Sequence, residues 1–343
     1  MKLPAFEKRP DPVERRVTAA ADFAPPIEFE GIIAISLPMR AVIRRIIEAA
    51  AVDIPVLITG ETGTGKELVA AAIHKRSRRR DKPYVALNTG AMARELVASE
   101  LFGHERGAYT GAQDAHPGIF EQAHGGTVFL DEIATMEEKI QVSLLRVLEE
   151  KVFRRVGGFK NIASDVRVIA ATNETLERHV CEKRFREDLF YRLNVFHINV
   201  PPLRERPPGA ITVLTDHFLS HYASVYGKEI ERVSPETYRI LRRYSWPGNV
   251  RELKNVIQAA LLLADGKELK PESIPERIRE VVALNGGGQP TCSFRVGSSL
   301  ESVEKELIRL TLAHAGGNKK LAASMLSISR RALYNKLKKH KLA

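Results

Sequence analysis

Cysteine is nearly missing from this chain of 343 residues. The two cysteines, Cys181 and Cys292, lie far apart in unrelated contexts, so they predict neither a disulfide framework nor a zinc site. Long apolar runs are missing too, because no stretch reaches the ~18 residues of a membrane-spanning helix. The charged amino terminus has no apolar segment behind it, as a secretion signal would. These absences argue against a secreted or membrane protein, and we expect a cytoplasmic one.

Acidic residues are missing from the end of the chain. Residues 317–343 hold eight Lys or Arg and no Asp or Glu, so this short segment carries most of the net charge of +11. A basic segment of this kind is typical of a nucleic-acid-binding module. The rest has the composition of a folded protein, with 44% hydrophobic residues, and the length indicates two or three domains.

Composition and periodicity divide the chain into five segments. Residues 1–29 are rich in proline and charge and are predicted to form a flexible arm. Residues 30–206 alternate apolar strands with helices, which predicts an α/β fold with a parallel sheet. Residues 207–283 are predicted to be wholly helical, residues 284–298 to be a linker, and residues 299–343 to be a small all-α domain.

A glycine-rich loop follows the predicted strand Val56–Thr59 and opens a helix. Its residues are Gly60, Glu61, Thr62, Gly63, Thr64, Gly65 and Lys66. In this context the backbone N–H groups close around phosphate oxygens, and the lysine reaches the β- and γ-phosphates. A plain glycine turn is the weaker alternative, because strand, spacing, lysine and helix all agree. The next residue is Glu67 instead of the usual Ser or Thr, so Mg²⁺ would depend more on Asp131, water and the phosphates.

Two acids end another predicted strand, Thr127–Asp131. Further strands are predicted at Tyr84–Asn88 and Val166–Thr172. Asp131 and Glu132 would lie at the carboxyl edge of the sheet, where open α/β sheets bind ligands. Asp131 is suited to coordinate Mg²⁺, and Glu132 is suited to polarise the attacking water. Together with the loop they predict a site that binds ATP and Mg²⁺ and hydrolyses ATP.

Residues 100–112, which read ELFGHERGAYTGA, narrow the class of ATPase. Their glycines and exposed aromatic suit a mobile surface loop. The segment resembles the signature of the sigma-54-dependent activators, the bacterial enhancer-binding proteins, whose loop usually reads Gly-Ala-Phe-Thr-Gly-Ala. The resemblance covers about Glu30 to the end and implies an AAA+ P-loop sheet with a helical lid. It also implies a sigma-54 contact by Gly107, Ala108, Tyr109, Thr110, Gly111 and Ala112.

The same resemblance implies further roles around the nucleotide. Asn88 is similar to the residue that restrains the catalytic glutamate, and Thr172 with Asn173 resembles the sensor of the γ-phosphate. Arg251, in the segment Trp246–Leu253, resembles a lid arginine that contacts nucleotide bound to the same subunit. Residues 151–158 resemble a second loop that supports the contact loop.

Two arginines resemble the fingers that reach into a neighbouring subunit's ATP. Arg186 and Arg192 lie in the sequence FREDLFYRL. A guanidinium at the transferring phosphoryl contributes ~10³–10⁵ in rate, whereas without the resemblance these would be surface ion-pair residues. Because fingers supplied in trans need a ring, the resemblance implies an active hexamer.

The basic segment is predicted to form a helix-turn-helix. Residues 318–326 and 330–339 would form two helices joined by residues 327–329, with Ser327 where glycine is more common. The unit resembles the Fis-type module, and we expect the preceding helix, Glu301–Ala313, to dimerise it on DNA. A solvated basic helix is the alternative. The predicted DNA contacts are Lys319, Lys320, Ser329, Arg330, Arg331, Tyr334, Asn335 and Lys336.

The implied function is activation of transcription from enhancer DNA. ATP hydrolysis would move the contact loop, which remodels the closed complex of sigma-54 RNA polymerase into an open one. The alternative is a generic AAA+ remodelling ATPase with a DNA-binding tail, but such a protein would not need the contact loop. A repressor with a vestigial nucleotide fold is disfavoured by the intact Lys66, Asp131 and Glu132. Only 29 residues precede the ATPase, too few for a sensory domain, so we expect control in trans by an inhibitory protein or by regulated synthesis.

Overall fold

The computed structural model describes residues 25–109, 114–264, 266–286, 299–315 and 318–340. The chain folds as two compact units, Met1–Ile274 and Pro275–Ala343. No helix in the described ranges is both long and apolar enough to span a membrane.

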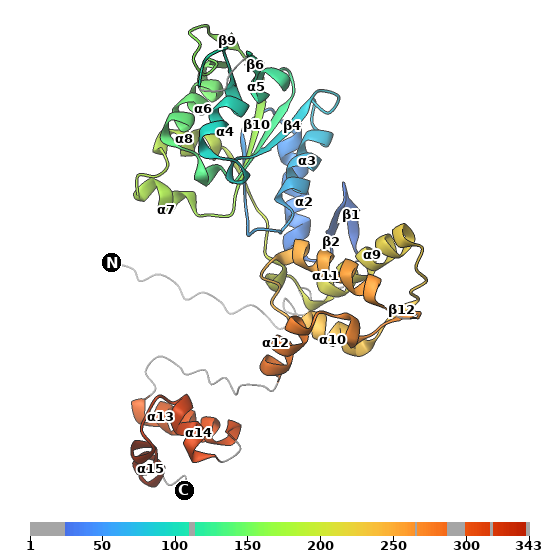
Figure 1. The fold of residues 1–343 in the computed structure, drawn as a ribbon, viewed down its shortest axis with the longest axis vertical. Coiled ribbons are helices and arrows are strands. Elements are labelled where there is room, and N and C mark those ends of the chain that lie inside the picture. The colour runs from blue at the N-terminus through green and yellow to red at the C-terminus, as the bar shows by residue number, and fades with distance from the viewer. Residues whose placement is uncertain (1–24, 110–113, 265, 287–298, 316–317, 341–343) are drawn as a thin grey trace, which may run out of the picture. The chain divides into compact units, whose positions relative to one another are not determined.

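A five-stranded parallel sheet is the centre of the first unit (Figure 1). Its strand order is β11-β3-β10-β7-β4. The strands are β3 (Val56–Thr59), β4 (Tyr84–Asn88), β7 (Thr127–Asp131), β10 (Arg167–Thr172) and β11 (Phe196–Asn199). The four predicted strands are confirmed, with β10 starting one residue later than predicted, and β11 was not predicted. The chain leaves β3 for a strand three places away, so the carboxyl end of β3 opens into the crevice where such sheets bind ligands.

Helices cover both faces of this sheet and form a core on each. Val56 and Ile58 of β3 pack into one core, whereas Leu57 packs into the other, so the first three positions of the strand are all apolar. The first core contains α2 (Leu37–Ala51) and α3 (Lys66–Arg76). The second contains α4 (Arg94–Phe102), α5 (Ile119–Gln122), α6 (Glu138–Glu150), α7 (Leu176–Cys181) and α8 (Glu187–Leu193).

A short hairpin precedes the sheet and corrects the predicted arm. Strands β1 (Ile27–Phe29) and β2 (Ile32–Ala34) pair antiparallel around Glu30 and Gly31, whose φ angles are 49° and 79°. Two left-handed residues are the mark of a tight two-residue hairpin turn. The prediction of an irregular arm is therefore wrong for residues 27–29, and residues 1–24 of that arm lie outside the described ranges.

The lid of the first unit is helical but not wholly so. Its helices are α9 (Pro208–Tyr226), α10 (Pro235–Arg243) and α11 (Asn249–Leu263). After α9, β12 (Arg232–Val233) pairs in parallel with β13 (Glu268–Leu269), which follows α11, and the prediction of a wholly helical segment missed both strands. Two-residue strands carry no periodicity in the sequence, and here an ion pair of 2.9 Å between Arg232 and Glu268 joins them across the chain.

Two further hairpins project from the sheet. The first joins β5 (Gly103–His104) to β6 (His116–Pro117), and the second joins β8 (Val152–Phe153) to β9 (Ile162–Ala163). They contain the predicted contact loop and the predicted second loop, respectively.

The second unit contains four helices among its described residues. They are α12 (Glu276–Gly286), α13 (Leu300–His314), α14 (Lys319–Met325) and α15 (Arg330–Lys339). The last two match the predicted helix-turn-helix, and Ala322, Ala323, Leu333 and Leu337 are buried between the helices. Helix α12 continues to Gly286, three residues into the predicted linker, and residues 287–298 of that linker lie outside the described ranges.

The turn of the helix-turn-helix has a left-handed residue that is not glycine. Ser327 has a φ of 53° and is exposed. Ser327→Gly relieves this conformation, so we expect it to stabilise the second unit by about 0.5–1 kcal/mol. Hydrogen exchange of the α14 and α15 amides in the full chain measures the change. The control, Ser324→Gly within α14, should destabilise the unit by a similar amount. A loss of protection in both variants would contradict the expectation.

Candidate functional site

The glycine-rich loop between β3 and α3 has the conformation of a phosphate cradle. Gly60, Gly63 and Gly65 have φ angles of 153°, 80° and 103°, a region that side chains other than glycine avoid. Lys66 is buried, and its Nζ donates to the carbonyl oxygens of Gly60 at 2.8 Å and Glu61 at 3.2 Å. Burial lowers the pKa of Lys66, while Asp131 and Glu132 act in the opposite direction. The Lys66 ammonium therefore lies within the loop and is hydrogen-bonded to two of its carbonyl oxygens, the location expected of a phosphate-binding lysine.

The lid holds this loop through backbone contacts. A Cβ on Gly63 would stand 2.3 Å from the carbonyl oxygen of Gly248, so only glycine permits the approach. The Arg251 N–H donates to the Gly63 carbonyl at 3.2 Å, and Asn249 Nδ2 donates to the Thr62 carbonyl at 3.0 Å. The sequence resemblance predicted the lid residue Arg251 for the nucleotide site, and in the structure this residue lies beside the glycine-rich loop.

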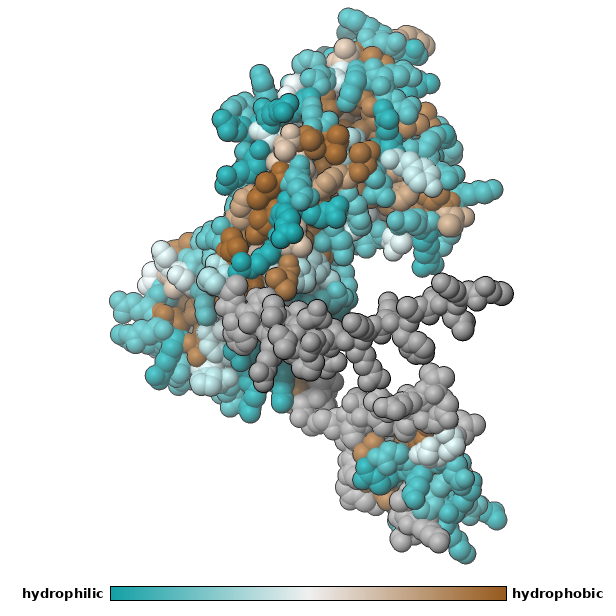
Figure 2. Space-filling view, turned by 180° about the vertical axis from the view of Figure 1, so that it is seen from behind, coloured by the Kyte–Doolittle hydropathy of each residue, from teal (hydrophilic) through white to brown (hydrophobic). Residues whose placement is uncertain are grey.

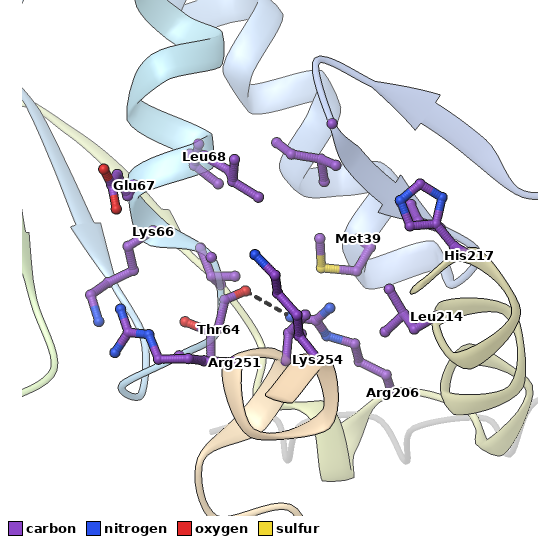
Figure 3. A pocket seen from close by; sticks show the side chains of 18 of the residues that line it. Met39, Thr64, Lys66, Glu67, Leu68, Arg206, Leu214, His217, Arg251 and Lys254 are labelled. Atoms are coloured by element: carbon purple, nitrogen blue, oxygen red, sulfur yellow. Dashed lines mark hydrogen bonds between the residues drawn. The ribbon is translucent and has the colours of Figure 1, made fainter. Parts of the chain in front are cut away.

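Two arginines at the start of the lid add to this attachment. Arg204 makes two hydrogen bonds to the Glu61 carboxylate, one of them at 2.6 Å. This pairing lowers the pKa of Glu61. Arg206 is buried and donates to the Thr64 carbonyl at 3.2 Å (Figure 3). Burial lowers the pKa of Arg206 to about 10. Sequence reasoning missed both arginines, because no local pattern indicates which distant acceptor an arginine will reach.

A pocket of about 340 Å³ opens beside the loop (Figure 3). One end is polar and contains the loop, Asp131 and Arg251. The other end is apolar, and its lining residues come from the first hairpin, from α2 and from α9: Ile32, Ile33, Met39, Leu214 and Phe218. The volume and the change from polar to apolar suit a molecule with phosphates at one end and a flat base at the other. The apolar end was not predicted, because its residues come from three separate segments that only the fold brings together.

The acidic strand end lies beside the loop as predicted. Glu132 has a φ of 58°, and left-handed backbone at a residue other than glycine is typical of functional sites. A Cβ on Gly90 would stand 1.9 Å from Glu132 Oε2, so the carboxylate lies directly over this glycine. The Thr89 hydroxyl lies 3.0 Å from the carbonyl oxygens of both Asp131 and Glu132. The turn after β4 therefore supports both acids.

Asn88 holds this turn through its side chain. Its Oδ1 accepts from the N–H groups of Gly90 at 2.9 Å and Ala91 at 3.0 Å. In strand register Asn88 pairs with Asp131. The asparagine thus shapes the backbone on which the Glu132 carboxylate rests, and its predicted restraint of that glutamate stays a prediction.

The predicted sensor contacts the phosphate loop. Asn173 Nδ2 donates to Thr62 Oγ1 at 3.1 Å, and the Thr172 carbonyl accepts from the Gly60 N–H at 3.3 Å. Thr172 itself is buried, and its hydroxyl accepts from the Glu174 N–H at 3.0 Å. Loop, acids and sensor therefore meet at one edge of the sheet.

The two predicted arginine fingers lie elsewhere. Arg186 directly precedes α8 and makes two hydrogen bonds to Asp188, at 3.1 and 2.7 Å, with Glu138 at 3.7 Å. Arg192 is exposed on the same helix. Neither is among the residues that line the nucleotide pocket in the described structure.

The described part of the contact loop touches the second loop. Thr110, Gly111 and Ala112 lie outside the described residues, but Gly107, Ala108 and Tyr109 are described. Tyr109 is 41% exposed, and its ring meets the His104 ring edge-on at 5.1 Å. A Cβ on Gly157 would lie 3.0 Å from Ala108 Cβ, so the two loops touch where both side chains are small or absent.

The predicted DNA-binding residues fall into three groups in the second unit. Lys320, Arg330, Arg331 and Asn335 are exposed. Lys319 lies over the Tyr334 ring at 5.1 Å, and Ser329 caps α15 by accepting from the Ala332 N–H. Lys336 is half-buried and pairs with Glu304 of α13. The tertiary structure therefore offers the first group most freely to DNA.

Comparison with known families finds a match for each of these parts. Residues 32–199 match the sigma-54 interaction domain, residues 204–286 the AAA+ ATPase lid domain, and residues 299–340 the Fis family of bacterial regulatory proteins.

Relatives of known identity share most of the chain. The regulatory protein AtoC of Escherichia coli is 46% identical over 287 residues, which are 83% of this chain and 62% of AtoC. NtrC of Klebsiella pneumoniae is 42% identical over 323 residues, which are 88% of this chain and 68% of NtrC. Among solved structures, NtrX from Brucella abortus in complex with ATP has a TM-score of 0.69 at 32% identity, over 96% of this chain and 72% of that one.

The fold and the site define an AAA+ P-loop ATPase with a helical lid, joined in one chain to a helix-turn-helix of the Fis type. The chain belongs to the family of sigma-54-dependent transcriptional activators.

The close approach of Gly63 to the lid gives a direct test of the pocket. Gly63→Ala should force the loop and the lid apart and weaken ATP binding by about tenfold or more. Titration with a fluorescent ATP analogue measures the affinity. Gly31→Ala is a matched control, because Gly31 lines the same pocket with a φ of 79° but a Cβ there meets nothing within 4 Å. Equal losses in the two variants would show that backbone strain, and not the contact with Gly248, is responsible.

Proposed function

We propose that this protein is an ATP-driven transcription activator that binds enhancer DNA and remodels the closed complex of sigma-54 RNA polymerase into an open one. The observation that carries the proposal is the presence, in one compact unit, of a nucleotide pocket and of the contact loop that starts at Gly107. The match of residues 32–199 to the sigma-54 interaction domain supports the choice of partner.

The residues at the sheet edge fit ATP and Mg²⁺. Donors for phosphate are present in Lys66 and the glycine-rich loop, and Asp131 supplies a carboxylate for the metal. ATP supplies the phosphoryl group whose transfer to water drives the cycle. Glu132 orients and polarises that water, while Asn173 detects the γ-phosphate, a role that its contact with the loop supports. Glu67, exposed at the start of α3, leaves the metal to Asp131, water and the phosphates.

The active form is a hexameric ring in this proposal. Arg186 precedes α8 and Arg192 lies in it, and neither is among the described residues that line the pocket of their own subunit, as fingers acting in trans require. Figure 2 supports association, because apolar residues gather on one face of the α/β part amid a largely hydrophilic surface. To reach the phosphate of a neighbouring subunit, Arg186 must release Asp188. The ion pair between them is therefore the resting arrangement of this arginine.

The second unit anchors the ATPase to double-stranded DNA. The exposed Lys320, Arg330, Arg331 and Asn335 provide phosphate contacts and base contacts, with α15 in the major groove. Helix α13 precedes this pair and would form the dimer that a two-part enhancer site needs. We further propose that the protein works in the cytoplasm, where promoter DNA is found, and that an inhibitory protein or regulated synthesis controls it in trans.

A promoter-opening assay tests the function as a whole. The wild-type protein should open a sigma-54 promoter in the presence of ATP. Thr110→Ala should still hydrolyse ATP without opening the promoter, because it alters the contact loop alone. Glu132→Gln should lose hydrolysis by about 10²-fold or more, because the water loses its general base. Permanganate footprinting of the melted strand and phosphate release are the two measurements. ATP turnover without opening by any variant would favour a generic AAA+ remodelling ATPase instead.

Salt dependence tests the DNA-binding surface. Arg331→Ala should weaken binding and reduce the slope of log K against log salt by about 1, because one phosphate contact is lost. Fluorescence anisotropy with enhancer DNA between low and physiological salt gives the slope. Arg309→Ala is the control, because Arg309 lies on α13 and is paired with Glu306 at 2.6 Å. An unchanged slope for Arg331→Ala would remove α15 from the proposed interface.

A further inference from the structure

Gln141 is a buried polar residue on an otherwise apolar side of α6. Its side chain is 1% exposed, and the other buried residues of this helix are Ile140, Leu144, Val147 and Leu148. Glutamine is usually found at the surface, because a buried amide lowers stability unless its hydrogen bonds are made inside the protein. Gln141 is not among the described residues that line the nucleotide pocket, so that pocket does not explain its burial.

The Gln141 amide is hydrogen-bonded to the backbone on both sides of Phe185. Its Oε1 accepts from the Arg186 N–H at 2.8 Å, and its Nε2 donates to the Arg184 carbonyl at 3.1 Å. The same Nε2 also donates to the Met136 carbonyl at 2.8 Å, so both amide hydrogens are used. Because two partners are carbonyls and the third is an N–H group, the orientation of the amide is fixed.

The segment that leads into Arg186 is held from other sides as well. The N–H groups of Arg184 and Phe185 both donate to the His179 carbonyl, at 2.8 and 3.2 Å. The Phe185 ring is buried in the core that contains α6 and α8. The Arg186 side chain, by contrast, is 38% exposed. The backbone of this arginine is therefore anchored, while its guanidinium lies at the surface.

Gln141 also connects this segment to the catalytic edge of its own subunit. Met136 directly follows the short turn η2 (Ile133–Thr135), and η2 directly follows Glu132. The Met136 N–H donates to the Ile133 carbonyl at 3.2 Å, which closes the turn. One side chain thus joins the turn after the catalytic glutamate to the backbone of a predicted arginine finger. An arginine on an anchored backbone loses less conformational freedom when it binds a phosphate.

We propose that Gln141 is a positioning residue for Arg186, and that it holds the backbone so that the guanidinium reaches the ATP of the neighbouring subunit. The inference rests on the proposed function, because Arg186 serves a neighbour only in a ring. A finger is effective only when it is placed accurately, since a displacement of about 1 Å costs about 10²-fold in rate. Gln141 acts through Arg186 and not on the nucleotide of its own subunit.

Gln141→Met tests the role of the amide in rings of a single variant. Methionine has a similar length and volume but makes none of the three hydrogen bonds. We expect kcat for ATP hydrolysis to fall about 10²-fold, with KM for ATP within about threefold of the wild type, because the variant's own pocket is unchanged.

Ser164→Ala is the control for a general loss of stability. It removes a buried hydrogen bond of 2.8 Å to the Phe120 carbonyl, in the same core but outside the segment that leads into Arg186. Its kcat should stay within about twofold of the wild type. Equal losses of kcat in Ser164→Ala and Gln141→Met would overturn the inference, because a weakened core would then explain both.

Mixed rings separate an effect on the neighbour from an effect within the subunit. Each test variant is diluted into an excess of Glu132→Gln, which lacks the general base but presents a normal Arg186 to its neighbour. Phosphate release per test subunit is compared with that of wild-type subunits diluted in the same way. Gln141→Met and Arg186→Ala should both recover to within about threefold of this reference. Asn173→Ala should stay low, because its defect lies in its own site.

The mixtures also distinguish failure of the inference from failure of the proposed function. A Gln141→Met subunit that stays inactive where Arg186→Ala recovers would overturn the inference alone. An Arg186→Ala subunit that does not recover would overturn the finger in trans, and the inference with it. Gln141→Glu repeats the test if Gln141→Met does not fold, because it keeps the oxygen that accepts from Arg186 and loses the amide donors. We expect the same loss alone and the same recovery in mixed rings.

Discussion

The contact between Gly63 and Gly248 is the constraint on which the nucleotide site depends. Because neither residue has a side chain, the phosphate loop and the start of α11 approach to backbone distance. Arg251 then donates to the Gly63 carbonyl, and Asn249 reaches the carbonyl of Thr62. The loop that holds phosphate is thus also the loop that holds the lid. Any bound group that moves one of them must act on the other.

A second chain of contacts leads from the acidic strand end to the two hairpins. Glu132 lies over Gly90, in the turn that follows β4. Helix α4 begins at Arg94, shortly after this turn, and ends at Phe102, immediately before β5 and the contact loop. A nine-residue helix therefore joins the catalytic edge to the contact loop. Arg155 fixes the second hairpin to the same base, so both loops share one support.

Charge pairing in the second unit decides which basic residues remain for DNA. Two acidic residues of α13 face α15: Glu304 pairs with Lys336, and Glu301 lies 3.3 Å from Lys339. His340 is buried beside the same Glu304, at 3.4 Å. Helix α13 therefore neutralises one flank of α15 while Arg330 and Arg331 stay exposed. The basic composition of the segment indicated nucleic acid, but it did not distinguish these two flanks.

Local pattern was sufficient for much of this protein. The phosphate loop, the strands around it and the two helices of the helix-turn-helix follow from spacing within a few residues, where glycine, apolar periodicity and capping act directly. The contact loop was found by its resemblance to a family. Local pattern failed for β12 and β13, which are too short to show a period, and for β1, which depends on a two-residue turn at Glu30 and Gly31.

Features that depend on contacts between distant segments were decided only by the tertiary structure. The apolar end of the pocket, the attachment of Arg204 and Arg206 to the loop, and the division of basic residues by Glu304 all join segments that are distant in the chain. The burial of Gln141 belongs to the same class, because a glutamine in the sequence predicts exposure by default. The sequence alone determined which chemistry is present. Packing determined which groups share a site and which face a partner, because those properties depend on neighbours that no local pattern specifies.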